Sequence, residues 1–346
     1  MTNDKSGRGG RSGSGSGSSA DKPPVTWRSD FSRDARAPDK RTRERERQAS
    51  PDAAGGRPGE RGGASYGRSG EQQGRARAAA DFVSGESQDA AYEAHAEARQ
   101  QRSQELRLFG LNACRAAFAN RPQDLRKVYL TEERIPAMKP VLAWCAQHKL
   151  GYRVVTDEDL RKLTSTQHHE GVCFEVTRRE LLNVAELIAL QPAAPAPALL
   201  VVLDGVGNPH NFGAVLRSAA NFGVSGILLP EESSLTLSGA ACRVAEGGAE
   251  AVPLARADTG ALAALRAAGF AIAATVVRGG ESIHAQPLPA RLVLVFGAER
   301  EGMRDALVKA ADRRLTIPGS GKVESLNIAA SAAVLFAEFY RQHIGT

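Results

Sequence analysis

The chain has 346 residues, with 45 Lys and Arg against 39 Asp and Glu and a formal net charge of +6. This length allows about two domains, and the small basic excess permits a nucleic-acid partner without requiring one. The longest apolar runs, Ala198 to Leu203 and Ala271 to Val277, are too short to span a bilayer, and the amino terminus lacks the apolar core of a secretory signal. We therefore expect a cytoplasmic protein without a membrane partner.

Residues 1–104 are predicted to form a disordered basic tail that ends in a helix. Gly, Ser, Arg and Pro dominate its first eighty residues, so burial of apolar side chains cannot offset the ordering entropy. Ala, Glu, Gln and Arg dominate residues 87–108, which favours a solvent-exposed helix. Arg-Gly segments at 7–11 and 61–63 resemble loose RNA-binding sequences, and a solubilising linker is the alternative.

Residues 105–178 are predicted to form a small α/β domain, because helical and strand-like segments alternate. The expected elements are a helix from Leu106 to Asn120, a strand at 127–130, a helix to Lys149, a strand at 152–155, a short polar helix and a strand at 171–176. His168 and His169 precede the last strand. Adjacent histidines point in different directions, so we expect loop or RNA-contact residues there and no metal site.

Residues 179–197 are rich in Pro and Ala and are predicted to form an extended linker. Residues 198–346 then form a second domain. Its first strand, Leu199 to Leu203, is uninterruptedly apolar, as in strands buried on both faces. The other expected elements are strands at 226–229, 271–277 and 292–296 and helices at 214–221, 259–268 and 303–311. The pattern indicates an α/β fold with a mostly parallel sheet.

The run from Leu326 to Phe336 contains no charged residue and predicts a helix that is buried on all sides. Such a helix would anchor the polar loop that precedes it. Four cysteines, Cys114, Cys145, Cys173 and Cys242, are widely scattered and predict buried, reduced thiols without a metal.

Three unusual loops follow predicted strands, at 208–213, 297–303 and 317–327, and ligands of α/β sheets bind where such loops gather. Two nucleotide-binding motifs are only approximated. After Gly205 and Gly207, His210 stands where a dinucleotide fingerprint needs a small residue. In the segment 316–323, Thr316 and Val323 replace the first Gly and the hydroxyl residue of a P-loop.

The three loops carry the segments Asn208 to Gly213 with Arg217 behind it, Gly297 to Glu299, and Ser325 to Asn327. In this order they resemble the three motifs of the SpoU (TrmH-like) branch of the SPOUT superfamily, the RNA 2′-O-ribose methyltransferases. The small domain resembles the substrate-binding domain of the same family. With its long tail, the chain looks most like the bacterial tRNA/rRNA methyltransferases of this branch.

The resemblance implies S-adenosyl-L-methionine as methyl donor and a ribose 2′-hydroxyl in structured rRNA or tRNA as acceptor. It also implies a homodimer, with an active site completed near the subunit interface, and a C-terminal trefoil knot. An RNA-binding ribosome-assembly factor that keeps the fold without the activity is the alternative from another class. A Rossmann-type dehydrogenase is a more distant third.

By the same resemblance, one set of residues would serve catalysis, namely Asn211, Arg217, Glu299, Ser325 and Asn327. A second set would line the cofactor site, namely Gly297, Ile317 and Leu326. Glycine allows close approach to a ligand, and the two aliphatic side chains offer an apolar wall for an adenine ring.

Each role has a structural alternative. Arg217 is the residue the family pattern assigns to hydroxyl activation, but a guanidinium is a poor base, so orienting the hydroxyl or binding a phosphate is easier to defend. It could equally be an exposed helix charge. We expect Asn211 in the turn before the helix, as a ligand contact or as its cap. Ser325 and Asn327 could cap the last helix.

The remaining alternatives concern loops and packing. Glu299 could be a solvated loop carboxylate, and Ile317 and Leu326 could serve packing alone. One departure from the family is His169-Glu170-Gly171, where many relatives carry Gln in place of Glu170. This departure bears on RNA specificity more than on the chemistry.

Overall fold

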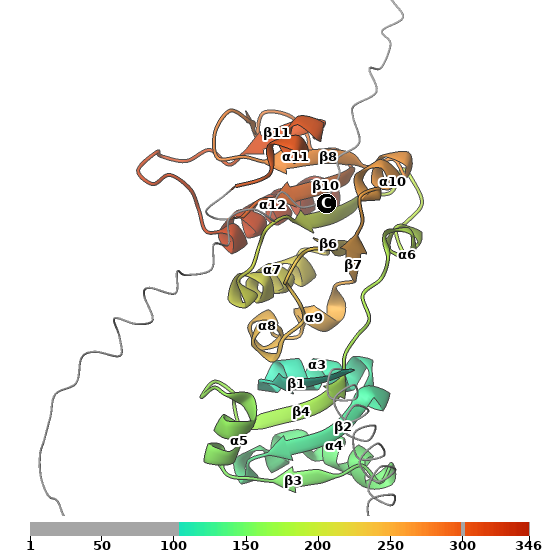
Figure 1. Cartoon of the computed structure of the whole chain (residues 1–346), viewed down its shortest axis with the longest axis vertical. Helices are drawn as coiled ribbons and strands as arrows, with labels where there is room; N and C mark the ends of the chain where they lie inside the picture. Colours follow the sequence, from blue (N-terminus) through green and yellow to red (C-terminus); the bar gives the residue numbers. More distant parts are fainter. Residues whose placement is uncertain (1–103, 299–301, 346) are drawn as a thin grey trace, which may run out of the picture.

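The computed structural model describes residues 104–298 and 302–345, which form two α/β units, one above the other in Figure 1. The smaller, N-terminal unit lies below, and the larger unit lies above it. The tail predicted over residues 1–104 falls outside the described residues except for its last position.

The first unit is a sheet with helices on both faces. Its elements are β1 (Glu105–Phe109), α3 (Leu111–Asn120), β2 (Leu125–Leu130), α4 (Ile135–Gln147), β3 (Tyr152–Val154), α5 (Asp157–Thr164) and β4 (Val172–Thr177), with short 3-10 turns at Pro122–Asp124 and Glu132–Arg134. The strand order is β1-β4-β2-β3, and only β2 and β3 run parallel. Cys114 of α3 and Met138 of α4 are buried on one face, and Leu160 of α5 is buried on the other.

The predicted helix from Leu106 to Asn120 is wrong in its first part. The structure has β1 there, then a break at Gly110 with φ 95°, and only then α3. In β1 the buried Leu106 and Leu108 flank the exposed Arg107, which is the two-residue period of a strand. Pairing with β4 overrides the helix-favouring residues upstream.

The second unit contains a larger sheet. Its elements are α6 (Val184–Ala189), β5 (Ala198–Leu203), α7 (Pro209–Asn221), β6 (Gly226–Pro230), α8 (Gly239–Ala245), α9 (Gly248–Ala251), β7 (Leu254–Ala257), α10 (Ala261–Ala267), β8 (Ala271–Thr275), β9 (Glu281–Ser282), β10 (Arg291–Phe296), α11 (Asp305–Ala310), β11 (Arg313–Thr316) and α12 (Ile328–His343). Within the described ranges the strand order is β7-β6-β5-β10-β8-β11-β9, and every neighbouring pair is parallel. The predicted α/β fold with a mostly parallel sheet is confirmed. The trefoil knot stays a prediction, because strand order alone does not define how the chain is threaded.

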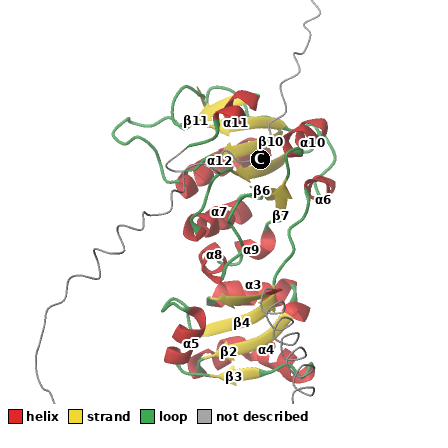
Figure 2. Ribbon diagram, viewed as in Figure 1, coloured by secondary structure: helices red, strands yellow, loops and turns green. Residues whose placement is uncertain are grey.

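Helices cover both faces of this sheet (Figure 2). Along β5, Leu199, Val201 and Leu203 join the buried cluster of α7 and α12, whereas Leu200 and Val202 join the cluster of α6, α10 and α11. Every residue of β5 is buried, as the uninterrupted apolar run predicted. The first site loop is therefore attached to a strand that is buried along its whole length.

The segment 179–197 differs from the extended linker we expected. Leu182 forms a parallel bridge with Ala255 of β7, and α6 follows with Asn183 as its cap. Val184 and Leu187 of α6 are buried against the large sheet, which gives the helix its reason to form. Only residues 190–197, between α6 and β5, are Pro-rich and non-helical as expected. The predicted domain boundaries stay a prediction.

A buried ion pair joins the two units. Arg121 at the end of α3 donates through Nε and Nη2 to both carboxylate oxygens of Glu250 on α9, each at 2.9 Å. Its Nη1 donates to Thr177 O at 2.7 Å and to Asp124, and Arg179 lies 3.6 Å from Glu250. Burial lowers the pKa of Arg121, but hydrogen bonds to Glu250 and Asp124 outweigh it and raise the pKa above its ordinary value. The guanidinium thus keeps its charge at the interface.

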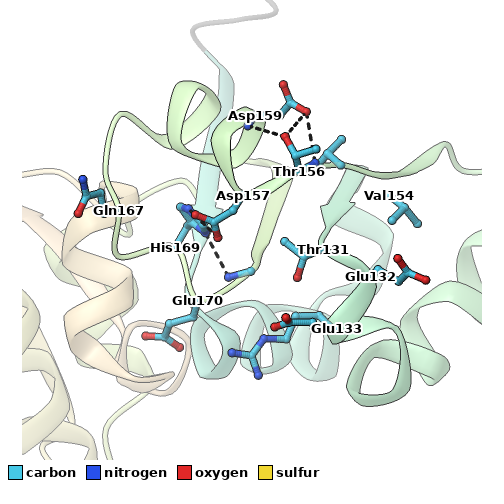
Figure 3. Close-up of a pocket in the computed structure, with 13 residues that line it drawn as sticks. Thr131, Glu132, Glu133, Val154, Thr156, Asp157, Asp159, Gln167, His169 and Glu170 are labelled. Atoms are coloured by element: carbon cyan, nitrogen blue, oxygen red, sulfur yellow. Dashed lines mark hydrogen bonds and ion pairs between the residues drawn. The ribbon is translucent and has the colours of Figure 1, made fainter.

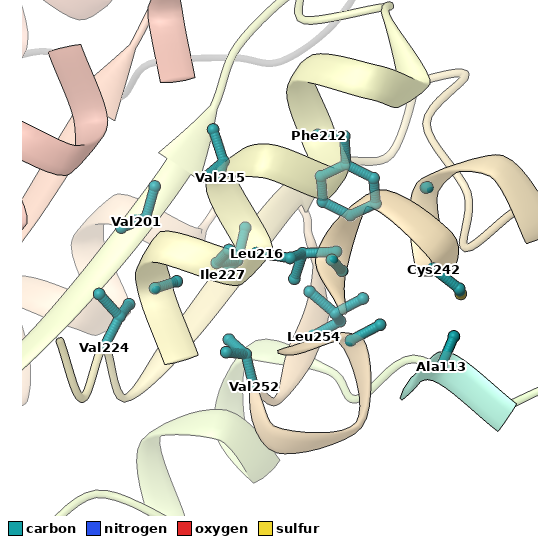
Figure 4. Close-up of a cluster of buried hydrophobic side chains, with 14 of the residues drawn as sticks. Ala113, Val201, Phe212, Val215, Leu216, Val224, Ile227, Cys242, Val252 and Leu254 are labelled. Carbon is teal, nitrogen blue, oxygen red and sulfur yellow. The ribbon is translucent and has the colours of Figure 1, made fainter. Parts of the chain in front are cut away.

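Apolar contacts continue across the same interface. Ala113 of α3 and Cys242 of α8 belong to one buried cluster with Phe212 and Leu216 of α7 (Figure 4). Gly239 at the start of α8 lies so close to β1 that a Cβ there would be 2.3 Å from Arg107 O. The two units are therefore packed as one continuous core rather than tethered loosely.

The prediction that the last helix is buried on all sides is wrong. One side of α12 is buried through Ile328, Leu335 and Phe336, but Val334 and Tyr340 are 37% and 38% exposed. An absence of charge predicts an apolar surface, but it does not say whether the same chain covers that surface.

Candidate functional site

The first predicted site loop follows β5 and leads directly into α7. Asn208 is the helix cap, because its side-chain oxygen accepts from His210 N at 2.8 Å and Asn211 N at 3.4 Å, and Pro209 fills the first helical position. The helix therefore begins five residues earlier than the expected start at residue 214. Asn211 lies in its first turn, so the alternative role as the cap belongs to Asn208.

The structure brings the first and third loops together. Asn327 Nδ2 donates to Asn211 Oδ1 at 3.1 Å, across 116 residues of sequence. Asn327 is also the cap of α12, since its Oδ1 accepts from Ala329 N at 2.9 Å. The cap alternative for Asn327 is thus confirmed, and the same side chain still reaches Asn211 with its amide nitrogen. One residue joins the helix start to the predicted site.

Arg217 does not join this pair. It lies on α7 six residues after Asn211, which places the two side chains roughly 120° apart around the helix axis. We expected Asn211 in the turn before the helix, but the helix begins at Pro209, so Asn211 and Arg217 lie on different sides of the same helix. Arg217 is exposed, and within the described residues its guanidinium has no hydrogen bond or ion pair.

The second loop closes tightly after β10. Ala298 and Gly302 exchange backbone hydrogen bonds at 3.0 and 2.9 Å, and Glu299 lies outside the described residues. A Cβ on Gly297 would be 2.4 Å from Met303 N, so the glycine is required by its own loop. The first and second loops touch, because a Cβ on Gly205 would be 3.1 Å from Ala298 Cβ.

Sequence reasoning missed an ion pair that fastens these two loops. Asp204 directly follows β5, is 5% exposed, and lies 2.7 Å from Arg304 Nη2. Arg304 also pairs with Glu232 at 3.1 Å. A carboxylate immediately after a buried strand was the available signal, but its partner is 100 residues away in the sequence. The pair fixes the loops that would surround a ligand.

The third loop carries two apolar side chains, and one of them, Leu326, directly precedes Asn327. Ile317 is half-buried against the main core cluster, and Leu326 is 48% exposed. Ser325, also exposed, lies between Leu326 and Glu324 in the same loop. Packing accounts for the covered part of Ile317 only, and the exposed Leu326 has more apolar surface left for a ligand.

The cysteines are buried and not disulfide-bonded, as predicted. Burial is the main cause that raises the pKa of the Cys173 and Cys242 thiols to about 12. Thiols that stay protonated are poor nucleophiles. Among the residues with described positions, no group of three or more His, Cys, Asp or Glu is arranged to hold a metal ion, and no helix is long and apolar enough to cross a membrane.

A parallel sheet covered on both faces, with polar loops meeting at the carboxyl ends of its central strands, defines an α/β protein of the kind that binds ligands at that edge. The model of the SpoU rRNA Methylase family matches residues 198–337, and the model of the RNA 2′-O ribose methyltransferase substrate-binding domain matches residues 107–182. The chain belongs to the SpoU methyltransferase family.

Known relatives agree with this membership. The chain is 38% identical over 247 residues to an uncharacterized tRNA/rRNA methyltransferase, YfiF, of Escherichia coli O157:H7, covering 71% of this chain and 70% of that protein. It is 34% identical to the 23S rRNA (guanosine-2′-O-)-methyltransferase RlmB of Nitrosomonas europaea, covering 68% and 91%. An AdoMet-bound rRNA methyltransferase from Sinorhizobium meliloti shares the fold, with a TM-score of 0.59, 23% identity and coverage of 71% and 90%.

Proposed function

We propose that the protein transfers a methyl group from S-adenosyl-L-methionine to a ribose 2′-hydroxyl in rRNA or tRNA. The observation that carries the proposal is the hydrogen bond between Asn211 and Asn327, which unites two family motifs at the carboxyl edge of the sheet. Membership of the SpoU family supports the same reaction. An enzyme that modifies rRNA or tRNA has to be in the same compartment as its substrate, and this supports a cytoplasmic location.

The residues around this edge fit the methyl donor. Ile317 and Leu326 offer apolar surface for an adenine ring, and Gly205 and the Gly297 loop keep backbone groups close to the edge. When bound, S-adenosyl-L-methionine supplies an activated methyl group on a sulfonium. The side chains of Asn211 and Asn327 would orient the polar groups of the bound donor and of the ribose at this edge, and Ser325 would add a hydroxyl from the same loop. Positioning supplies much of the acceleration in such a transfer.

Arg217 acts on the ribose in this proposal, but at the active site of a second copy of the chain. Its guanidinium is exposed and lies on a different side of α7 from Asn211. A homodimer that packs α7 and α12 of one chain against the other would bring Arg217 to the partner site. The exposed apolar side chains Val334 and Tyr340 on α12 supply a surface for that contact.

Donor binding tests the function. Isothermal calorimetry of the full chain with S-adenosyl-L-methionine should show binding, and Leu326→Asp should weaken it at least about 10-fold, because an apolar contact of this size contributes roughly 1.5–3 kcal/mol. Leu190→Asp is the matched control, since Leu190 is 62% exposed between α6 and the start of β5, away from the carboxyl edge of the sheet, and it should bind normally. Absence of binding at millimolar S-adenosyl-L-methionine would contradict the methyltransferase proposal and favour the alternative, an RNA-binding assembly factor.

Solution mass tests the homodimer. Light scattering should give about twice the 36.6 kDa of one chain, and Val334→Asp should shift the protein to the single-chain mass, because a buried unpaired carboxylate opposes the contact. Leu190→Asp should keep the wild-type mass. A wild-type protein that stays at the mass of one chain at micromolar concentration would contradict the shared active site.

A further inference from the structure

A groove in the small unit lies apart from the methyltransferase loops. It has a volume of about 720 Å³ and lies where β2 and β3 end and β4 begins (Figure 3). Its lining comes from residues 131–134, 154–157, 159, 167 and 169–171. β2 and β3 are parallel neighbours, and the carboxyl ends of such strands are where α/β proteins place ligands.

His169 lines this groove with an unsatisfied buried nitrogen. Its side chain is 2% exposed, and its Nε2 has no hydrogen-bond partner. Gly171 N donates to its Nδ1 at 3.2 Å, so in the uncharged ring the proton resides on Nε2. Asp157 Oδ1 is 3.7 Å from Nε2, beyond hydrogen-bond distance, and the Asp157 side chain is 80% exposed. The groove thus offers a free N–H donor beside an open carboxylate.

The turn that holds His169 is tied to the methyltransferase unit. Glu170, at φ 55°, accepts from Leu111 N at 2.9 Å and so caps α3, which has no other side-chain cap. Its second oxygen is 3.8 Å from Arg243 of α8. Glu170 therefore forms a charged contact between the two units. The groove is positioned relative to the catalytic edge by this contact.

The charges of the groove favour a base over a phosphate. Its lining includes Glu132, Glu133 and Asp157, with Arg134 as a basic side chain, so a phosphate group would be repelled. Asp159 is engaged in the cap of α5, where it accepts from Thr156. A neutral nucleobase can present hydrogen-bond donors to the carboxylates and stack on the planar guanidinium.

We propose that this groove binds one unpaired guanine base of the substrate RNA, separate from the nucleotide that is methylated. The guanine edge has an acceptor, O6, next to two donors, N1–H and N2–H. The Nε2–H of His169 would donate to O6, and the Asp157 carboxylate would accept from both donors. Adenine, cytosine and uracil lack two adjacent donors on this edge. The inference rests on the proposed function in taking RNA as the ligand.

Short RNAs test the groove without the methyl donor. Fluorescence anisotropy should show that the full-length protein binds the pentanucleotide U-U-G-U-U at least about 10-fold more tightly than U-U-A-U-U, the discrimination expected of one bidentate contact. Asp157→Asn should reduce this preference to less than about 2-fold, because an amide cannot accept both donors. Glu158→Gln is the matched control. Glu158 is a neighbouring exposed carboxylate of α5 outside the groove, and the variant should keep the preference.

Three results would overturn the inference. They are equal affinity of the wild-type protein for both RNAs, an unchanged preference in Asp157→Asn, and binding of an arginine-rich peptide that Asp157→Asn abolishes while neither RNA binds. The last result would assign the groove to a cationic protein segment. Calorimetry of donor binding by the same protein separates the groove proposal from the methyltransferase proposal. A guanine preference without donor binding would contradict the methyltransferase proposal alone.

Discussion

Arg217→Ala is expected to lower the rate of ribose methylation by roughly 100- to 1,000-fold, the loss typical of removing one preorganised charged group from a transition state. Affinity for S-adenosyl-L-methionine should not change, because Arg217 lies away from the loops that would hold the donor. Transfer of radiolabelled methyl groups to bulk rRNA and tRNA measures the rate, and calorimetry measures the affinity. Lys309→Ala, which removes an exposed basic side chain in the last turn of α11, is the control and should remain active.

Mixing variants tests whether the site is shared between chains. Arg217→Ala and Asn211→Ala should each be inactive alone. Because Arg217 and Asn211 would come from different chains, refolding the two variants together should restore part of the activity through mixed dimers that contain one intact site. No restoration would place both side chains in the site of the same chain, and retained activity of Arg217→Ala alone would remove Arg217 from the mechanism.

Glu250→Ala is expected to destabilise the folded protein by about 3–5 kcal/mol, since it leaves the Arg121 guanidinium buried at the interface without its main partner. The side chains of both residues are more than nine-tenths buried. Urea denaturation followed by circular dichroism measures the free energy of unfolding. The two units share one buried cluster, so we expect them to lose structure together.

Glu246→Gln provides the comparison for this prediction. Glu246 accepts from Asn112 at 2.7 Å across the same interface, but this contact is exposed. A glutamine oxygen can still accept, so the free energy of unfolding should change by less than about 0.5 kcal/mol. If Glu250→Ala caused an equally small change, the buried ion pair would have no part in holding the two units together.

The sequence predicts the central elements of the fold well. The apolar runs that became β5, β6, β8 and β10 are buried on both faces, and continuous burial leaves a signal in each segment by itself. β1 was mistaken for a helix because five residues carry too little periodicity, and its identity comes from pairing with β4. The start of α7 was missed although Asn208 and Pro209 form a cap signal that sequence alone could have supplied.

The candidate site is predictable only in part. The motif resemblance predicted Asn211 and Asn327 for one site, and their side chains meet. The ion pair between Asp204 and Arg304 could not be predicted, because two residues that are 100 positions apart leave no local sequence pattern. The exposed side of α12 could not be predicted from its apolar composition, since burial by the same chain and burial by a second copy select the same residue types.

β10 lies in the middle of the large sheet, between β5 and β8, yet it is made after both of them. During synthesis, β5, β6 and β7 can pair in order, but the neighbour of β5 on its other side is still absent when β8 emerges. The sheet therefore cannot form strand by strand from the N-terminus, because its central strand, β10, is synthesised after the strands on both sides of it. Until then β5 has an unpaired, wholly apolar edge, which is the state in which a nascent chain most needs protection from aggregation.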